Sequence, residues 1–144
     1  MKNIFEETYG QREALKKAYD GAADESEKEK IRETFNGILK SLESLGEAAG
    51  RLWREYETAR DNGNELLDIS EVVWEKDVEI LVSCLRKIGI ERFTFSSAWS
   101  GAVETAWLFK EAGCELEGLT EINGSRAAFS EDHEKKHGYL FKVN

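Results

Sequence analysis

The segment HEKKH, from His133 to His137, is the part of the sequence that most directly suggests catalysis. It matches H-E-x-x-H, in which two histidines one helical turn apart bind zinc and the glutamate acts as a general base. Lysines occupy both intervening positions, and only seven residues follow to supply a third ligand. We therefore expect a polar loop or single helical turn between two strands and no cofactor. A metal-dependent hydrolase using His133, Glu134 and His137 remains an alternative, with the two histidines as weak metal candidates.

Three serines form a second candidate site in the junction FTFSSAWSGAVET. Ser96 and Ser97 end a strand pattern, and Ser100 lies at the start of a helix pattern, so hydroxyl and backbone N–H groups gather where α/β proteins often hold anions. No glycine-rich phosphate motif is present, and AWSGA lacks both outer glycines of G-x-S-x-G. We interpret the segment mainly as a junction in which Ser97 or Ser100 caps the helix. A possible anion site at Ser96, Ser97 and Ser100 is the alternative.

Four glutamates, Glu111, Glu115, Glu117 and Glu121, lie close together in the sequence. On an extended strand Glu115 and Glu117 share one face at a spacing of about 6.6 to 7 Å, near the phosphate repeat of single-stranded DNA. Such a row could occupy a basic groove in place of nucleic acid. Any solvent-facing strand would show the same row, which is the simpler explanation.

The chain has four tryptophans, Trp53, Trp74, Trp99 and Trp107. We expect Trp74 in the core. Trp99 and Trp107 are eight positions apart with Val103 between them, so we expect them to pack against the sheet. Trp53 lies beside an apolar seam and is the best candidate for an exposed aromatic anchor at a protein interface, although packing against the first helix is the favoured interpretation.

Apolar residues recur at alternating intervals of four and three positions from Ile31 to Ala59. This heptad pattern is typical of a helix that presents one narrow stripe to a partner helix. It predicts one continuous helix over residues 24–61, with a break near Gly46 and Gly50 as the alternative. A shorter helix before it would form an antiparallel hairpin with it but would leave part of the seam uncovered. The rest would pack on the C-terminal half or form a homodimer.

The second half changes to short alternating elements, ELLDIS, a helix ending at Gly89, IERFTFSS, a helix from 98 to 112, CELEGLTEIN and GYLFKV. Helical crossovers indicate parallel neighbouring strands with both helices on one face. The predicted fold is α+β: residues 1–62 form a helical arm with one long heptad-bearing helix. Residues 63–144 form a small two-layer β-α-β-α-β-β unit.

The net charge of −9 argues against direct nucleic-acid binding, because no basic stripe offsets it. An acidic surface favours a partner with a basic surface. Cys84 and Cys114 are too few for a disulfide scaffold and indicate small buried residues in a reducing compartment. The start of the sequence lacks the apolar region of a signal peptide, and no long apolar run follows. We expect a cytoplasmic protein that does not enter a membrane.

Four segments, MKNIFEETY, NGNELLDISEVVWEKDVE, IERFTFSSAWSG and GCELEGLTEIN, resemble a family of short accessory proteins from mobile elements and phages of gut bacteria. The resemblance covers the first nine residues and most of 62–123, and the heptad segment looks like an insertion. No activity or site residue is assigned in that family. The resemblance implies a genetic setting in which small acidic proteins include inhibitors of CRISPR effectors and restriction enzymes.

These observations lead to a non-enzymatic, acidic protein-binding module as the expected function. It would inhibit a host nucleic-acid enzyme, as anti-CRISPR and anti-restriction proteins do, by occupying a basic groove. The expected contact residues are Glu111, Glu115, Glu117, Glu121 and Trp53. An oligomeric adaptor built on the seam of Ile38, Leu42, Leu45 and Leu52 is a further alternative besides the hydrolase.

Overall fold

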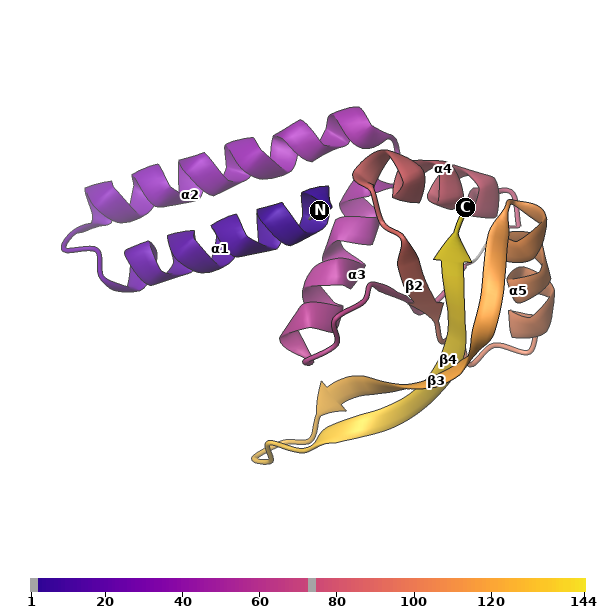
Figure 1. The fold of residues 1–144 in the computed structure, drawn as a ribbon. Coiled ribbons are helices and arrows are strands. Elements are labelled where there is room, and N and C mark those ends of the chain that lie inside the picture. The colour runs from indigo at the N-terminus through magenta and orange to yellow at the C-terminus, as the bar shows by residue number, and fades with distance from the viewer. Residues whose placement is uncertain (1–2, 73–74) are drawn as a thin grey trace.

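The computed structural model describes residues 3–72 and 75–144, so Trp74, expected in the core, lies outside the described residues. A helical region comes first, and a unit in which strands alternate with α4 and α5 follows (Figure 1), which confirms the predicted α+β class. The elements are α1 (Ile4–Asp20), α2 (Glu25–Ser41), the 3₁₀ helix η1 (Leu42–Leu45), α3 (Ala49–Asp61), β1 (Asp68–Ile69), α4 (Asp77–Ile88), β2 (Arg92–Phe95), α5 (Ala102–Glu111), β3 (Cys114–Arg126) and β4 (His133–Val143).

The sheet has the strand order β1-β2-β4-β3, with β1 parallel to β2 and the other two pairs antiparallel. The prediction of parallel neighbours is therefore correct for β1 and β2 but wrong for β2 and β3. The physical reason is the hairpin that joins β3 and β4. Because β4 pairs with β3 on one side and with β2 on the other, it occupies the position between them.

One side of the sheet forms an aromatic core with α5. The ring centroid of Phe109 lies 5.1 Å from that of Phe93, 5.3 Å from Phe95 and 5.5 Å from Phe141. All four side chains are buried. Helix α4 contacts α5 and β4, so the two crossover helices lie together, as expected for two layers.

The prediction of one continuous helix over 24–61 is wrong, and the chain breaks where the alternative placed it. Helix α2 ends at Ser41, and Gly46 adopts a φ of 127°, a conformation that glycine tolerates far better than other residues. The break has a clear physical reason, because α1 can cover only the length of α2. After the turn, α3 runs back to the body, where Leu52 and Tyr56 are buried.

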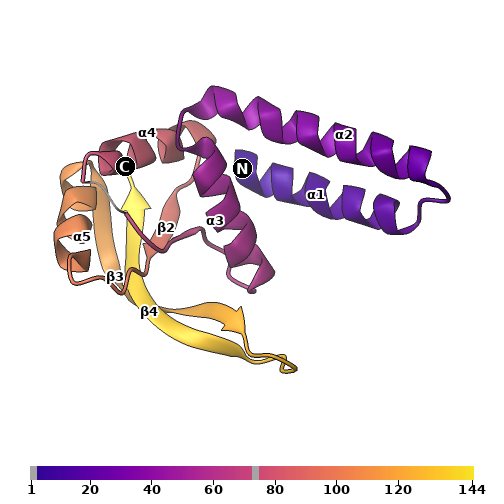
Figure 2. The same cartoon turned by 180° about the vertical axis from the view of Figure 1, so that it is seen from behind.

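Helices α1 and α2 form the expected antiparallel hairpin, which extends to one side of the body (Figures 1 and 2). No residue of α2 is fully buried. Leu42 and Leu52 of the predicted seam are buried within the same chain. These two residues are therefore taken up by the core and are not free to form a dimer interface.

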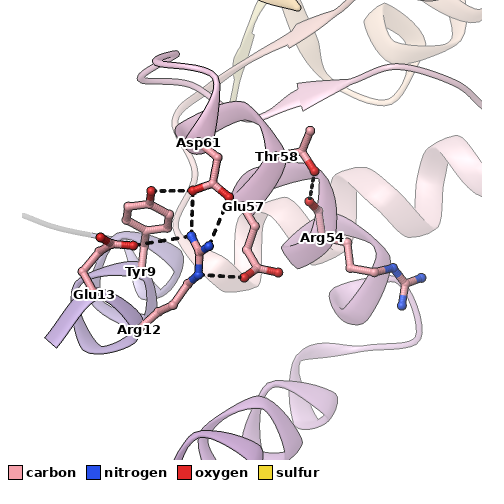
Figure 3. Close-up of polar contacts among 7 residues, drawn as sticks. All are labelled: Tyr9, Arg12, Glu13, Arg54, Glu57, Thr58 and Asp61. Atoms are coloured by element: carbon pink, nitrogen blue, oxygen red, sulfur yellow. Dashed lines mark hydrogen bonds and ion pairs between the residues drawn. The ribbon is translucent and has the colours of Figure 1, made fainter. Parts of the chain in front are cut away.

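A cluster of polar side chains ties α1 to the end of α3 (Figure 3). The Arg12 guanidinium donates to both carboxylate oxygens of Asp61, at 2.8 and 3.1 Å, and lies 3.2 Å from Glu57. The Tyr9 hydroxyl donates to Asp61 at 2.8 Å. The hydrogen bond from Arg12 lowers the pKa of Asp61 below its ordinary value.

This cluster should make stability depend on pH. Because the folded pKa of Asp61 is lowered, its contribution is present above the unfolded pKa and is lost as pH falls through the folded one. Asp61→Asn is expected to cost roughly 0.5 to 1 kcal/mol at pH 7, since the pair is partly exposed. Urea denaturation at pH 7 and near pH 2.5 should show the difference from wild type shrinking in acid. Glu13→Gln, which removes a longer 3.6 Å contact to Arg12, should change little, and an equal loss would contradict the assignment.

Candidate functional site

The outward side of α5 and the turn before it carry large exposed apolar side chains. Trp99 is 67% exposed, Val103 66% and Trp107 54%. The expectation that they pack against the sheet is wrong, because α5 begins at Ala102, and Phe109 fills the position over the aromatic core. The Lys110 ammonium lies 4.4 Å from the centroid of the Trp107 ring.

The neighbouring strand β3 extends this apolar surface. Leu116 pairs in register with Phe141, and Leu119 with Tyr139. Because Phe141 contacts Phe109 of α5, and Tyr139 lies two residues away on the same side of β4, both leucines lie on the α5 side of the sheet. Leu116 is 49% exposed and Leu119 76%. We call Trp99, Val103, Trp107, Leu116 and Leu119 the α5–β3 face.

Strand β3 is also an edge of the sheet. It pairs with β4 on one side only, so the backbone N–H and C=O groups along its other side have no strand partner among the described residues. Such an edge can accept an additional strand. The face therefore combines exposed aromatic rings with a backbone that can form hydrogen bonds.

The predicted acidic row is divided by a β-bulge between Leu116 and Gly118. Glu115 pairs in register with Lys142, and Glu117 contacts Arg92 at 2.7 Å. Both carboxylates therefore lie on the side away from α5. The extra residue of the bulge shifts the alternation, so Glu121 lies on the α5 side.

Glu115 and Glu117 share one face of β3, as expected, but Glu121 lies on the other, so the four glutamates do not form one acidic row. The hydrogen bond from Arg92 lowers the pKa of Glu117, and Arg92 and Lys142 offset the charge of that side. On the α5 side, exposed Glu104 and Glu111 lie on α5 itself. Together with Glu121 they give the rim of the α5–β3 face more negative than positive charge.

Trp53 does not lie on this surface, and its expected role as an exposed anchor is wrong. Its side chain is 3% exposed, and its ring centroid lies 5.4 Å from that of Phe5 of α1. The structure instead shows packing against the first helix, the interpretation that the sequence favoured. Tyr56 stacks on the same ring at 6.0 Å. Trp53 therefore joins α3 to α1 and supports the body.

The three serines do not converge on one point. Ser96 donates to the Asp68 carboxylate at 2.6 Å, while Ser97 accepts a hydrogen bond from the Trp99 N–H at 3.2 Å. The N-cap residue of α5 is Gly101, without a side-chain cap, so the expectation that Ser97 or Ser100 caps this helix is wrong. The Ser96 hydroxyl donates its proton to Asp68, so it is not free to donate to an anion.

The HEKKH segment belongs to strand β4 and is not the expected loop or helical turn. In an extended strand, four residues separate His133 and His137 by about 13 Å, too far to bind one ion together. His133 Nδ1 lies 2.8 Å from the Gly124 carbonyl, and His137 lies 4.0 Å from Glu121. Within residues 3–72 and 75–144, no three potential metal ligands of the His, Cys, Asp and Glu types come together.

Both cysteines are free and buried, as expected for small core residues. Burial raises the pKa of Cys114 to about 11. At that value the thiol stays protonated at neutral pH, so it is a poor nucleophile. Neither cysteine therefore adds chemistry to the α5–β3 face.

The sequence analysis missed the α5–β3 face, although the sequence contained a signal for it. The side of α5 that packs on the core needs no tryptophan, because Ala102, Ala106 and Phe109 already recur at helical spacing along it. When that side is already filled, other large apolar residues of the same helix must point to solvent. Counting the residues of that side first would have placed Trp107 on the surface.

A protein-family model described as "Domain of unknown function (DUF7698)" matches residues 51–143, from α3 to the end of β4. No curated protein and no solved structure matches the chain. In the part of the chain that the structure describes, no helix has the length and hydropathy needed to cross a membrane.

Proposed function

The chain belongs to the family described as Domain of unknown function (DUF7698), and we propose that it is a protein-binding module that docks through its α5–β3 face. The family assigns no activity to carry over, so the proposal rests on the surface of this chain. The observation that carries it is the exposure of Trp99 and Trp107, each more than half exposed beside exposed Leu119.

Exposed aromatic residues of this kind need a physical explanation. Single apolar residues on a surface are ordinary, but contiguous apolar patches mark interaction sites. Tryptophan is enriched among the residues that dominate binding energy, because it buries a large rigid surface on contact. Trp107 contributes nothing comparable to the core, since Phe109 already fills that role. Its retention on the outside is best explained by a partner.

The charge around the face indicates the chemistry of that partner. Among the described residues of α5 and β3 on this side, Glu104, Glu111 and Glu121 are acidic and Lys110 is basic, and the whole chain carries −9. We infer a partner surface with an apolar pocket flanked by lysine and arginine. Opposite charges at the rim would speed association and set orientation.

A basic surface is typical of enzymes that act on nucleic acids, because lysine and arginine neutralise the backbone phosphates. We propose that the partner is a host enzyme of this class, such as a CRISPR effector or a restriction nuclease, and that binding blocks its basic groove. The chain would then be an accessory protein of a phage or mobile element and would act in the cytoplasm. The edge of β3 could add backbone hydrogen bonds to the same contact.

The test compares three tagged proteins against purified CRISPR effectors and restriction nucleases by biolayer interferometry and nuclease assay. Wild type should bind one of them and inhibit it. The variant with Trp99→Ala and Trp107→Ala should bind at least about tenfold more weakly, because aromatic anchors carry much of the binding energy. The control is Phe129→Ala, which removes an aromatic side chain that is fully exposed elsewhere, in the β3–β4 turn.

Salt and charge provide the second part of this test. Glu111→Lys should weaken binding mainly through a slower association rate, and the loss should shrink at high salt. Unchanged binding by the double tryptophan variant would refute the α5–β3 face as the docking site. An equal loss in Phe129→Ala would refute it as well.

A further inference from the structure

A polar pocket lies between α3 and the β3–β4 hairpin. In Figures 1 and 2 the far half of the hairpin curves toward the side on which α3 lies. The pocket has a volume of about 320 Å³ and is lined by side chains from α3, β1 and both strands of the hairpin. Asn64 holds this arrangement together, because its side chain donates to the Asn123 carbonyl at 2.8 Å and accepts from the Asn123 N–H at 3.0 Å.

The pocket is on the other side of the sheet from the α5–β3 face. Asp68 pairs in register with Thr94, and the neighbours of Thr94 on β2, Phe93 and Phe95, point toward α5. Successive side chains of a strand alternate between faces. Asp68 and Thr94 therefore point away from α5, so the pocket is separate from the proposed docking surface.

The two carboxylates in the pocket, Asp68 and Glu55, already accept hydrogen bonds from donors of the protein. Asp68 accepts from Thr94 at 2.8 Å, Ser96 at 2.6 Å and Lys136 at 2.9 Å. Asp68 is buried, whereas the Lys136 side chain is 39% exposed. The contact with Asp68 orients the Lys136 ammonium at the wall of the pocket, while part of its side chain stays in solvent.

Glu55 holds a second cation in the same way. It accepts from Arg51 Nε at 3.0 Å and from the Ser70 N–H at 3.0 Å. Arg51 also donates through Nη2 to the Glu71 carbonyl. Burial raises the pKa of Glu55, and the hydrogen bond from Arg51 opposes that rise. The Arg51 guanidinium is thus oriented by two contacts at the edge of the pocket.

The pocket also has hydrogen-bond donors beyond those that its two carboxylates engage. Arg54 lines the pocket, and its guanidinium takes part in none of the ion pairs among the described residues. Figure 3 shows its side chain pointing away from the cluster around Arg12 and Asp61. Lys136 has two further N–H groups besides the one facing Asp68. Three cations against two carboxylates give a local excess of positive charge in a chain whose total is −9.

We propose that this pocket binds the phosphate group of a small phosphorylated molecule. A tetrahedral phosphate offers several acceptors, which match an arginine fork and a fixed ammonium. An amine would instead need acceptors, and both carboxylates already accept hydrogen bonds from the protein. The pocket volume is at the lower end of those that hold small molecules. It has room for a phosphate with a small organic group attached.

The experiment titrates ¹⁵N-labelled protein with inorganic phosphate and, separately, with ribose 5-phosphate, using sodium chloride at equal ionic strength as the reference. Both phosphates should give saturable NMR shifts at the amides of Arg51, Asn64, Ser70, Asn123 and Lys136. Tighter binding of ribose 5-phosphate would assign the site to phosphomonoesters, and equal binding would assign it to free phosphate. Either result supports the phosphate chemistry.

Two variants and one competitor decide the outcome. Arg54→Ala should weaken binding at least about tenfold, because a hydrogen bond to a charged group is lost, and it should leave the fold intact because Arg54 is exposed. Arg126→Ala, which removes an exposed arginine outside the pocket, should bind as wild type does. Shifts that do not saturate, or an equal loss in both variants, would overturn the proposal. Tighter binding of a short single-stranded oligonucleotide would also overturn it, in favour of a nucleic-acid backbone.

Discussion

Phe109→Ala is expected to lower the free energy of unfolding by about 3 to 5 kcal/mol, the usual cost of emptying a buried phenylalanine site. The ring is fully buried and has ring centroids of three other phenylalanines within 5.5 Å. Removing it leaves a cavity under α5 that the rigid strands of the sheet cannot close. Since small domains have a total stability of 5 to 15 kcal/mol, urea denaturation should show a large shift of the midpoint.

The matched control is Val103→Ala on the outward side of the same helix. Val103 is mostly exposed, so this change should stay within about 0.5 kcal/mol of wild type. The contrast separates the two sides of α5, one that holds the helix on the sheet and one that remains available to a partner. If both variants lost the same stability, α5 would not be seated through Phe109, and the assignment of its outward side would fail with it.

The order of helices and strands after residue 63 could be predicted because the apolar residues of each element repeat at the spacing of a strand or of a helix. Phe93 and Phe95 alternate along β2, whereas the apolar residues of α4 recur with helical spacing. These patterns depend only on local geometry. The strand order could not be predicted in the same way, because it depends on which edge of the sheet the β3–β4 hairpin meets.

The break between α2 and α3 shows a different limit. The heptad spacing from Ile31 to Ala59 continues across Gly46, although the helix does not. The spacing indicates only that α2 and α3 each have one apolar side. It does not indicate that the apolar side of α2 packs on α1, whereas that of α3 packs on the body. Only the length of α1 indicated that a continuous seam would stay partly uncovered.

The candidate sites were harder to predict because they depend on a few contacts between distant residues. The bulge at Glu117 reverses the alternation of β3, and its local signal is Gly118, because an isolated glycine inside a strand often marks a bulge. The pocket beside Asp68 brings together residues from α3, β1 and β4. The net charge of the sequence predicted only that a partner would be basic. The exposed apolar side chains of α5, which only the structure reveals, indicate where on the surface it would bind.

Gly138→Ala is the substitution with the next largest expected effect, because β4 passes very close to the end of β2 at this point. A Cβ atom on residue 138 would lie 2.6 Å from the Phe95 carbonyl oxygen and 2.8 Å from Ile122 Cδ1. The first of these is a backbone atom within the sheet, so the strands themselves must shift. Overpacking of this kind typically costs about 1 to 3 kcal/mol, which urea denaturation would measure.

The shift should also reach the polar pocket, because Lys136 is two residues before Gly138 on the same side of β4 and contacts Asp68 at 2.9 Å. Moving β4 away from Phe95 would lengthen that contact and disturb the fixed ammonium. We therefore expect Gly138→Ala to lose stability and phosphate binding together, whereas Arg54→Ala loses only the binding. Gly37→Ala, where a Cβ would meet open space on α2, should instead raise stability by up to about 1 kcal/mol. An unchanged unfolding midpoint in Gly138→Ala would show that β2 and β4 do not approach so closely.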